Sequence, residues 1–230
     1  MQILITGFQR SGTTMLRRIL NAHPHIRVMF HEQFLLRQYN SKKGVLKFLK
    51  AKKIHPYDEN WGEKCPFYPA IRQVPVIDYC RRWNEYFGKT SRILHIVRHP
   101  VDVALSVQAK AASKGKKVKG GFEKPYEMFR EWMRYYVPKI NNMKNTFSFK
   151  YEDLLMDPDT LLPLIFEYLH IDKDIDFRAA MSRIKQERYR IIDSSRAFAY
   201  RNGPPIKIKT DMRSTLNVIN RTIGGVEYTI

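Results

Sequence analysis

Cysteine is scarce in this sequence, with only Cys65 and Cys80 among 230 residues. Two isolated thiols lack the spacing of a metal site and favour a reducing compartment. No apolar run is long enough to span a membrane. The apolar residues 3–5 predict a strand where a signal peptide would otherwise begin. We therefore expect a cytoplasmic protein with no transmembrane segment and no bound metal.

Acidic residues are also few, with 22 Asp and Glu against 41 Lys and Arg and a formal net charge of +19. This excess attracts polyanions, which include nucleic acids, acidic polysaccharides, anionic lipid surfaces and phosphorylated cofactors. Hydrophobic residues make up 43% of the sequence, which is enough for a globular protein with a buried core. The length favours a single domain over residues 1–230.

Strand and helix patterns alternate along the chain. Apolar runs predict strands at residues 3–5, 27–30, 92–97 and 146–151. Apolar residues at helical spacing predict helices that start near residues 13, 42, 76, 100 and 158, and another over 129–140 in which Pro138 causes a kink or an end. The alternation predicts an α/β fold with three layers, αβα, around a central parallel sheet. Residues 108–124 hold six lysines and three glycines, which indicates a mobile surface loop.

In such a fold, ligands bind beyond the carboxyl ends of the strands. Gly7, Glu32, Arg98 and Tyr151 all lie at or just past a predicted strand end. We therefore expect one crevice to collect them.

The most informative motif is at residues 2–14, which read QILITGFQRSGTT. A buried strand leads into a turn bounded by Gly7 and Gly12, and a helix follows. The N–H groups of such a turn and the helix N-terminus favour a bound anion. The turn carries further side-chain donors, which are Arg10, Ser11, Thr13 and Thr14.

This motif differs from the loop of nucleoside triphosphatases. That loop needs Lys followed by Ser or Thr after its last glycine, so that Lys meets the outer phosphates and the hydroxyl meets magnesium. Here Thr13 takes the Lys position and the cation stands earlier, at Arg10. The pattern favours a phosphate or sulfate group without an obligatory metal. A glycine turn with no ligand is the alternative, and Arg10 beside two hydroxyls argues against it.

A second motif is at residues 92–106, which read RILHIVRHPVDVALS. A predicted strand ends at Arg98, and Ser106 lies on the helix that follows. Together with the first motif, this segment resembles the PAPS-dependent sulfotransferases, in particular the bacterial and carbohydrate-modifying members. The resemblance spans about residues 2–160. It implies a P-loop-like fold, 3′-phosphoadenosine-5′-phosphosulfate (PAPS) as donor, PAP as product and no metal.

The resemblance also implies two groups of cofactor-binding residues. The 5′-phosphosulfate would be held by the first motif, at Arg10, Ser11, Gly12, Thr13 and Thr14. The 3′-phosphate would be held by Arg98 and Ser106, and in a late Arg-Asn-Gly segment by Arg201, although Asn202 replaces the family's lysine. Tyr151, in a Tyr-Glu-Asp segment, would lie near the adenine. Two separate cationic sites suit PAPS, whose negative charges form two clusters.

The expected reaction moves a sulfuryl group from PAPS to a hydroxyl or amine by in-line attack, with Arg10 stabilising the departing phosphate. Glu32, in a His-Glu-Gln-Phe segment similar to that of the family, is the first candidate for the base. His31 is the alternative, because its imidazole titrates closer to neutral pH. Lys64, in a Trp-Gly-Glu-Lys-Cys-Pro segment similar to that of bacterial members, would meet the sulfate or the acceptor. His99 is expected to be structural.

The acceptor is expected to be a saccharide, a glycolipid or another small molecule, and the basic surface favours an anionic one. The lysine-rich helix predicted at residues 42–53 is first of all a solvated face, and it leaves peripheral membrane contact open. Two other functions compete with a sulfotransferase. One is a P-loop kinase or nucleotidase. The other is a basic nucleic-acid-binding domain, which we do not expect because no nucleic-acid-binding signature is present.

Overall fold

The structure is a computed structural model that describes residues 1–29, 34–39, 41–55, 60–68, 75–118, 121, 123–171, 197–202, 213–225 and 227–228. Its strands are β1 (Gln2–Phe8), β2 (Ile26–Val28), β3 (Asn60–Phe67), β4 (Ser91–Val97) and β5 (Thr146–Lys150). Its α-helices are α1 (Thr13–Asn21), α2 (Leu35–Gln38), α3 (Lys42–Ala51), α4 (Val76–Phe87), α5 (Pro100–Ala112), α6 (Glu123–Glu131), α7 (Val137–Asn141), α8 (Tyr151–Met156), α9 (Pro158–Tyr168) and α11 (Arg213–Thr222). Shorter turns are η1 (Gly88–Thr90), η2 (Trp132–Tyr136) and η4 (Ala199–Asn202).

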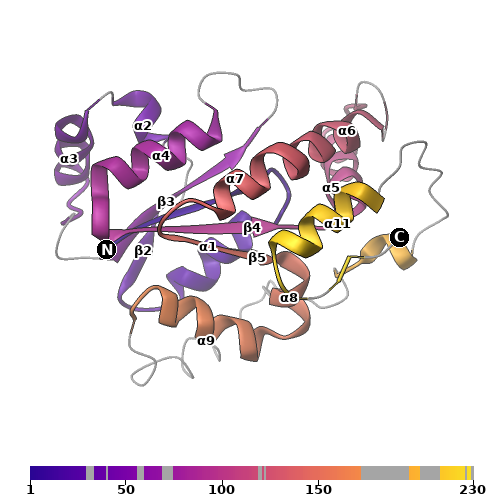
Figure 1. Ribbon diagram of the computed structural model, residues 1–230. Coiled ribbons are helices and arrows are strands. Elements are labelled where there is room, and N and C mark those ends of the chain that lie inside the picture. Colours follow the sequence, from indigo (N-terminus) through magenta and orange to yellow (C-terminus); the bar gives the residue numbers. More distant parts are fainter. Residues whose placement is uncertain are drawn as a thin grey trace.

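The five strands form one parallel sheet in the order β2-β3-β1-β4-β5. Helices cover both faces, with α1, α8 and α9 on one and α4 and α7 on the other (Figure 1). The central strand β1 is buried along its whole length. Ile3 and Ile5 pack into one apolar cluster, and Leu4 and Phe8 pack into the other. A strand covered on both faces reads as a continuous apolar run, and the predicted α/β fold with a central parallel sheet is therefore confirmed.

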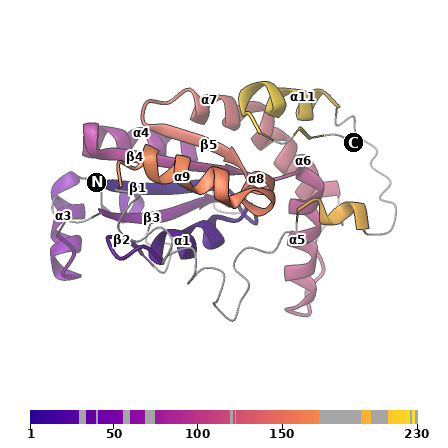
Figure 2. The ribbon, with the colours of Figure 1, turned by 90° about the horizontal axis from the view of Figure 1, so that it is seen from below.

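The parallel arrangement brings the carboxyl ends of β1, β4 and β5 to one edge of the sheet. The segments that follow these strands lead into α1, α5 and α8. Figure 2 shows α5 standing beyond this edge, whereas α3 lies at the opposite end of the molecule. The lysines of α3 therefore lie far from the place where a ligand of such a sheet would bind.

Three sequence predictions need correction. Gly7 belongs to β1, so the turn starts after Phe8. Residues 108–112 are the last part of α5 and not a loop, because Ala109, Ala111 and Ala112 are strong helix formers. Strand β3 was not predicted, since Gly62 and Pro66 are poor strand residues and its charged residues hide its burial.

Pro138 does not end the helical segment, and the irregular turn lies just before it. The chain runs from α6 through the π-helical turn η2 into α7, and Pro138 lies at the start of α7. Proline has no N–H to donate to the preceding turn, and a π-turn at that place absorbs the missing bond. The regular α-helix is therefore interrupted just before Pro138, where the sequence predicted a kink or an end.

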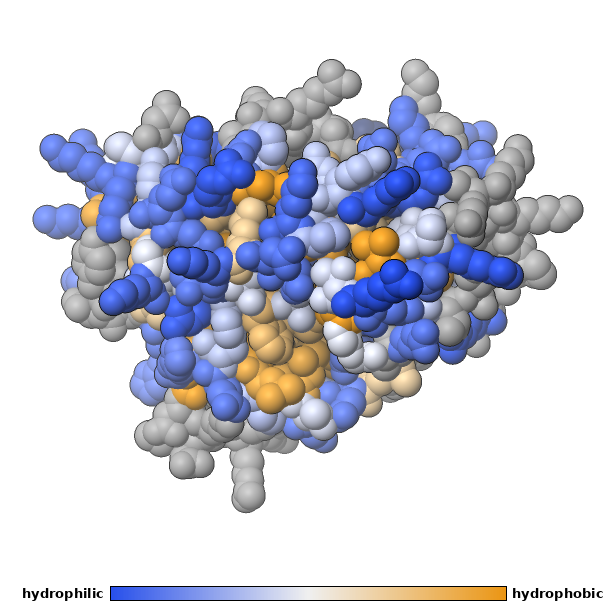
Figure 3. All heavy atoms as spheres, in the orientation of Figure 1, coloured by the Kyte–Doolittle hydropathy of each residue, from blue (hydrophilic) through white to orange (hydrophobic). Residues whose placement is uncertain are grey.

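The visible surface is largely hydrophilic, in keeping with the high content of Lys and Arg (Figure 3). None of the helices that the structure describes combines the length and the apolar character needed to cross a bilayer.

Candidate active site

The loop between β1 and α1 is built from two left-handed residues, Arg10 with φ 71° and Gly12 with φ 95°. The backbone N–H of Ser11 donates to the carbonyl oxygen of Phe8 at 3.1 Å, which closes the turn. A Cβ atom on Gly12 would clash with the Tyr151 ring. Glycine is therefore required at residue 12 both for its φ and for the close approach of Tyr151.

The N-terminus of α1 suits an anion. Gly12 gives it no side-chain cap, and its first turn contains no acidic residue. The Ser11 hydroxyl is buried and has no hydrogen-bond partner among the residues that the structure describes. A buried hydroxyl without a partner is costly, and backbone N–H groups at a helix start attract negative charge. The loop is therefore fit to hold a phosphate or sulfate group.

Arg98 lies just past the end of β4 and reaches across to this loop. Its Nη1 donates to the carbonyl oxygen of Arg10 at 3.2 Å. Its guanidinium lies 4.5 Å from the centre of the Tyr151 ring, and its Nη2 lies 3.9 Å from Oδ2 of Asp102. Stacking and these two contacts hold the planar guanidinium in one orientation.

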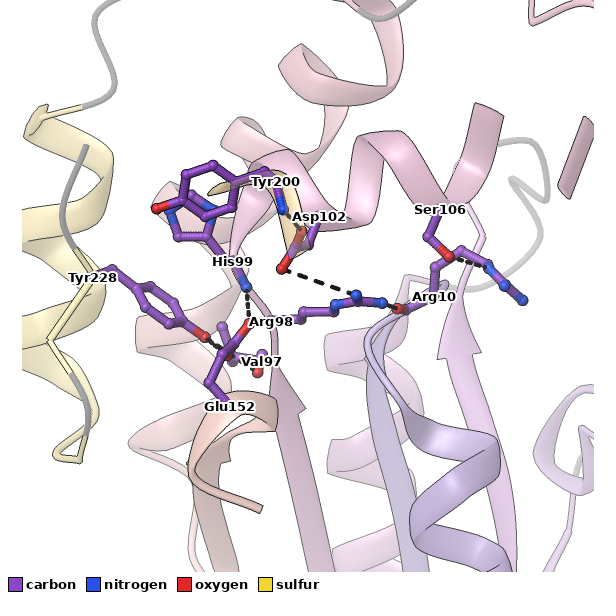
Figure 4. A network of polar contacts seen from close by, with 9 residues as sticks. All are labelled: Arg10, Val97, Arg98, His99, Asp102, Ser106, Glu152, Tyr200 and Tyr228. Atoms are coloured by element: carbon purple, nitrogen blue, oxygen red, sulfur yellow. Dashed lines mark hydrogen bonds and ion pairs between the residues drawn. The ribbon is translucent and has the colours of Figure 1, made fainter. Parts of the chain in front are cut away.

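Arg10 joins the loop to α5. Its Nε donates to Oγ of Ser106 at 3.0 Å, although the two residues are 96 positions apart in the sequence. Burial, and to a lesser degree the charge of Arg98, lower the pKa of Arg10 below its ordinary value. Two neighbouring cations of this kind favour an anion between or beside them. Figure 4 shows how Arg98 points to the backbone of Arg10 and how Arg10 points to Ser106.

Lys64 enters the same site from β3. It is almost fully buried, and its Nζ donates to Oγ1 of Thr14 at 2.8 Å. Thr14 lies in the first turn of α1 next to Thr13. The structure thus brings Lys64 to the start of α1, next to the loop.

Asp102, which sequence reasoning missed, connects Arg98 to the late segment that contains Arg201. Its Oδ1 accepts a hydrogen bond from the backbone N–H of Tyr200 at 3.0 Å. Burial raises the pKa of Asp102, while the charge of Arg98, the hydrogen bond from Tyr200 and, last, the charge of Arg201 oppose that rise. The turn η4 is held against α5 in this way, so Arg201 lies on the Arg98 side of the site.

His99 has a packing role in the structure. Its ring is buried and stacks on Tyr200, with ring centres 4.4 Å apart and an interplanar angle of 13°. Its backbone N–H donates to Oε1 of Glu152 at 2.9 Å. These contacts agree with the structural role expected of it.

The two candidate bases, His31 and Glu32, lie outside the described residues. The segment that follows them is anchored at Leu35, whose N–H donates to Oε2 of Glu63 at 3.2 Å. The Tyr79 hydroxyl donates to the other oxygen of Glu63 and accepts from the N–H of Leu36. The sequence analysis did not predict the contact between Glu63 and Tyr79, because the two residues come together only in the folded protein.

The pH dependence of stability should report on Glu63. Burial raises the pKa of Glu63 to about 7, despite the hydrogen bonds from Tyr79 and Leu35. The folded protein therefore holds this proton more tightly than the unfolded chain does, and this contribution to stability is lost as the pH rises through 7. From pH 4.5 to 7, wild-type protein should lose about 3 kcal/mol of unfolding free energy relative to Glu63→Gln.

Denaturant unfolding of both proteins across this pH range measures that difference. Because the remaining titratable groups are shared, their contributions cancel in the comparison. A difference that stays constant with pH would show that Glu63 titrates normally.

Comparisons with known proteins found one family model and several solved structures that are similar to this chain. A family model described as the sulfotransferase family matches residues 2–72, which include the phosphate loop and Lys64. No curated protein matches the sequence. Solved structures with a similar fold include a sulfotransferase domain from the curacin biosynthetic pathway, at 17% identity and a TM-score of 0.60, with 95% of this chain and 96% of that chain covered.

Two further structures hold PAP. Mouse sulfotransferase SULT7A1 in complex with PAP matches at 18% identity and a TM-score of 0.52, with 97% of this chain and 75% of that chain covered. Retinol dehydratase in complex with androsterone and inactive cofactor PAP matches at 15% identity and a TM-score of 0.51, with 100% and 82% covered. The first 72 residues are thus similar to the sulfotransferase family, and the whole chain has the fold of solved sulfotransferase structures.

Proposed function

We propose that this protein transfers a sulfuryl group from PAPS to a hydroxyl or amine of a small-molecule or saccharide acceptor. The observation that carries the proposal is the meeting of two cationic groups at one edge of the sheet. Arg98 donates to the backbone of Arg10, and the Arg10 side chain donates to Ser106. PAPS and its product PAP carry negative charge at both the 5′ and the 3′ position, which is what a site with two cationic ends can bind.

The described residues fit this nucleotide. The unpartnered Ser11 hydroxyl, Gly12, Thr13 and Thr14 would hold the 5′ end together with Arg10. The 3′-phosphate would be held by Arg98 and Ser106, with Arg201 nearby. Tyr151 offers a ring at the boundary between the two groups, because it contacts both Arg98 and the Gly12 position.

The protein's contribution to transfer is positioning and charge stabilisation. When PAPS is bound, it supplies the sulfuryl group, which leaves the 5′-phosphate as a bond to the acceptor oxygen or nitrogen forms. Arg10 and the N-terminus of α1 stabilise the charge that grows on the phosphate. Lys64 orients the transferring group or the acceptor, and the acceptor proton passes to a base. In the part of the chain that the structure describes, no group of three His, Cys, Asp or Glu could hold a metal ion, and the proposed steps use none.

Glu32→Gln should keep PAP affinity and lower the transfer rate about a hundred- to ten-thousandfold, which is the usual contribution of a general base. The proposal rests on the sequence, in which Glu32 precedes by three positions the backbone N–H of Leu35 that Glu63 anchors. PAP titration and single-turnover transfer measure the two effects separately. His31→Gln is the matched variant, and near-normal transfer by Glu32→Gln together with a loss in His31→Gln would assign the base to His31.

Transfer of radiolabelled sulfate from PAPS to a panel of saccharides, glycolipids, phenols and peptides tests the proposed activity directly. The strongly basic composition favours anionic acceptors, so sulfated or carboxylated members of the panel should be labelled best. If no acceptor is labelled although the protein binds PAP, the proposed acceptor class is rejected and the proposed donor site is still supported. We also propose a cytoplasmic location, because Cys65 and Cys80 are buried free thiols.

A further inference from the structure

The carboxyl group of Glu152 joins three separate parts of the chain. It is fully buried in the first turn of α8. Its Oε1 accepts from the N–H of His99 at 2.9 Å, and its Oε2 accepts from the hydroxyl of Tyr228. The β4–α5 junction, the β5–α8 junction and the C-terminal segment therefore meet at one carboxyl group (Figure 4).

Glu152 and its partner His99 each follow a proposed cofactor-binding residue in the sequence. Arg98 immediately precedes His99, and Tyr151 immediately precedes Glu152. Because peptide units are planar and stiff, fixing the His99 N–H against the Glu152 side chain also fixes the backbone of Arg98 relative to that of Tyr151. The 4.5 Å stack of the Arg98 guanidinium on the Tyr151 ring depends on this spacing.

Tyr228 is itself held firmly in place. Asn220 of α11 receives the Tyr228 N–H and donates to the Tyr228 carbonyl, each at 2.9 Å. The Tyr228 ring packs edge-on against the His99 ring at 5.2 Å, and Nζ of Lys150 lies 4.8 Å from its centre. The hydroxyl of Tyr228 points toward Glu152 and the carbonyl oxygen of Val97.

On these contacts we propose that Glu152 and Tyr228 are positioning residues that hold Arg98 in the orientation needed to bind the 3′-phosphate of the nucleotide. The inference rests on the proposed function and deepens it. If this buried pair had only a structural role, apolar side chains could replace it with little loss of folding stability, because burying polar groups costs free energy. The pair instead satisfies both carboxyl oxygens and aims at the backbone next to Arg98. The C-terminal part of the chain, which the sequence motifs leave unassigned, thereby takes part in nucleotide recognition.

Tyr228→Phe tests the inference, because it removes one hydroxyl and keeps the packed ring. The affinity for PAP should fall about tenfold, the size of one hydrogen bond in free energy. The affinity for adenosine 5′-monophosphate, which has no 3′-phosphate, should stay within about twofold of the wild-type value. Loss of affinity for both nucleotides to the same extent, or no loss for PAP, would overturn the proposal.

Two matched variants complete the experiment. Tyr168→Phe removes a hydroxyl that accepts from the N–H of Ile93 at the far end of β4, and it should leave both affinities unchanged. Glu152→Gln keeps an oxygen for the His99 N–H and offers an amide N–H to the Tyr228 oxygen, so it should bind PAP better than Tyr228→Phe does. Weaker PAP binding by Glu152→Gln than by Tyr228→Phe would count against the hydrogen bond as the cause.

If Tyr228→Phe does not fold, hydrogen exchange of the wild-type protein decides the matter. PAP should slow exchange in the peptides that contain His99 and Tyr228 more than adenosine 5′-monophosphate does, and equal slowing by both would overturn the inference. Failure of the wild-type protein to bind PAP would instead reject the proposed function and the inference with it. Tight PAP binding that is unchanged in Tyr228→Phe would reject the inference alone.

Discussion

Arg10→Ala should lower the rate of sulfuryl transfer about a hundred- to a thousandfold, the usual effect of removing one donor that stabilises charge in the transition state. Its affinity for PAP should change much less. The contact that Arg98 makes to residue 10 goes to the backbone carbonyl, so it survives the substitution. The left-handed backbone of residue 10 is as accessible to alanine as to arginine, so the loop itself should keep its shape.

Single-turnover transfer and PAP titration on the same variant separate these two effects. Arg10→Lys keeps a positive charge but loses the planar Nε contact to Ser106, and its rate should lie between those of wild type and Arg10→Ala. Lys47→Ala, which removes an exposed charge from α3 at the far end of the molecule, controls for net charge and should behave as wild type. Equal rates in Arg10→Ala and Lys47→Ala would contradict the role of Arg10.

The second large effect is expected for Arg98→Ala, which should weaken PAP binding by about 2 kcal/mol or more, roughly 30-fold. Arg98 is mostly buried, and its guanidinium is fixed by Tyr151, Asp102 and the carbonyl oxygen of Arg10. A preorganised guanidinium loses little entropy when a phosphate binds, so its removal costs much of that interaction. The loss should be specific to the 3′-phosphate, and adenosine 5′-monophosphate should bind nearly as before.

Arg98→Lys sharpens this test. Lysine keeps the charge, but it cannot donate in a planar fork or stack on Tyr151 in the same way. It should therefore recover only part of the lost PAP affinity. Full recovery would show that charge alone is recognised, and unchanged PAP affinity in Arg98→Ala would remove Arg98 from the nucleotide site.

Local sequence patterns predicted much of the fold. The apolar runs in β1 and β4 and the helical spacing in α4 are strong signals, and the structure confirms the elements to within a few residues. The strand β3 was not predicted because it contains charged residues. These residues can be buried only because partners distant in the sequence form hydrogen bonds with them. Lys64 donates to Thr14, and Glu63 receives the Tyr79 hydroxyl. The sequence of residues 60–67 alone does not indicate that these partners exist.

The residues of the candidate site also fall into two groups, those that local motifs predicted and those that they did not. The loop residues and Arg98 could be proposed because each lies in a short motif with a mechanical reason for its residue types. The residues that hold them, Asp102, Glu152 and Tyr228, act through contacts between positions 53 to 98 apart. Such pairs depend on the packing of the whole sheet, and a single sequence contains no signal for them.

The most direct test of the central claim is a calorimetric comparison of two nucleotides with wild-type protein. PAP is titrated in the presence of a metal chelator, and ATP is titrated with excess magnesium. One pocket with separate cationic ends for 5′ and 3′ anionic groups predicts that PAP binds without metal and clearly more tightly than magnesium-ATP. Binding of magnesium-ATP as tight as that of PAP, or tighter, would contradict the account and favour a P-loop kinase or nucleotidase.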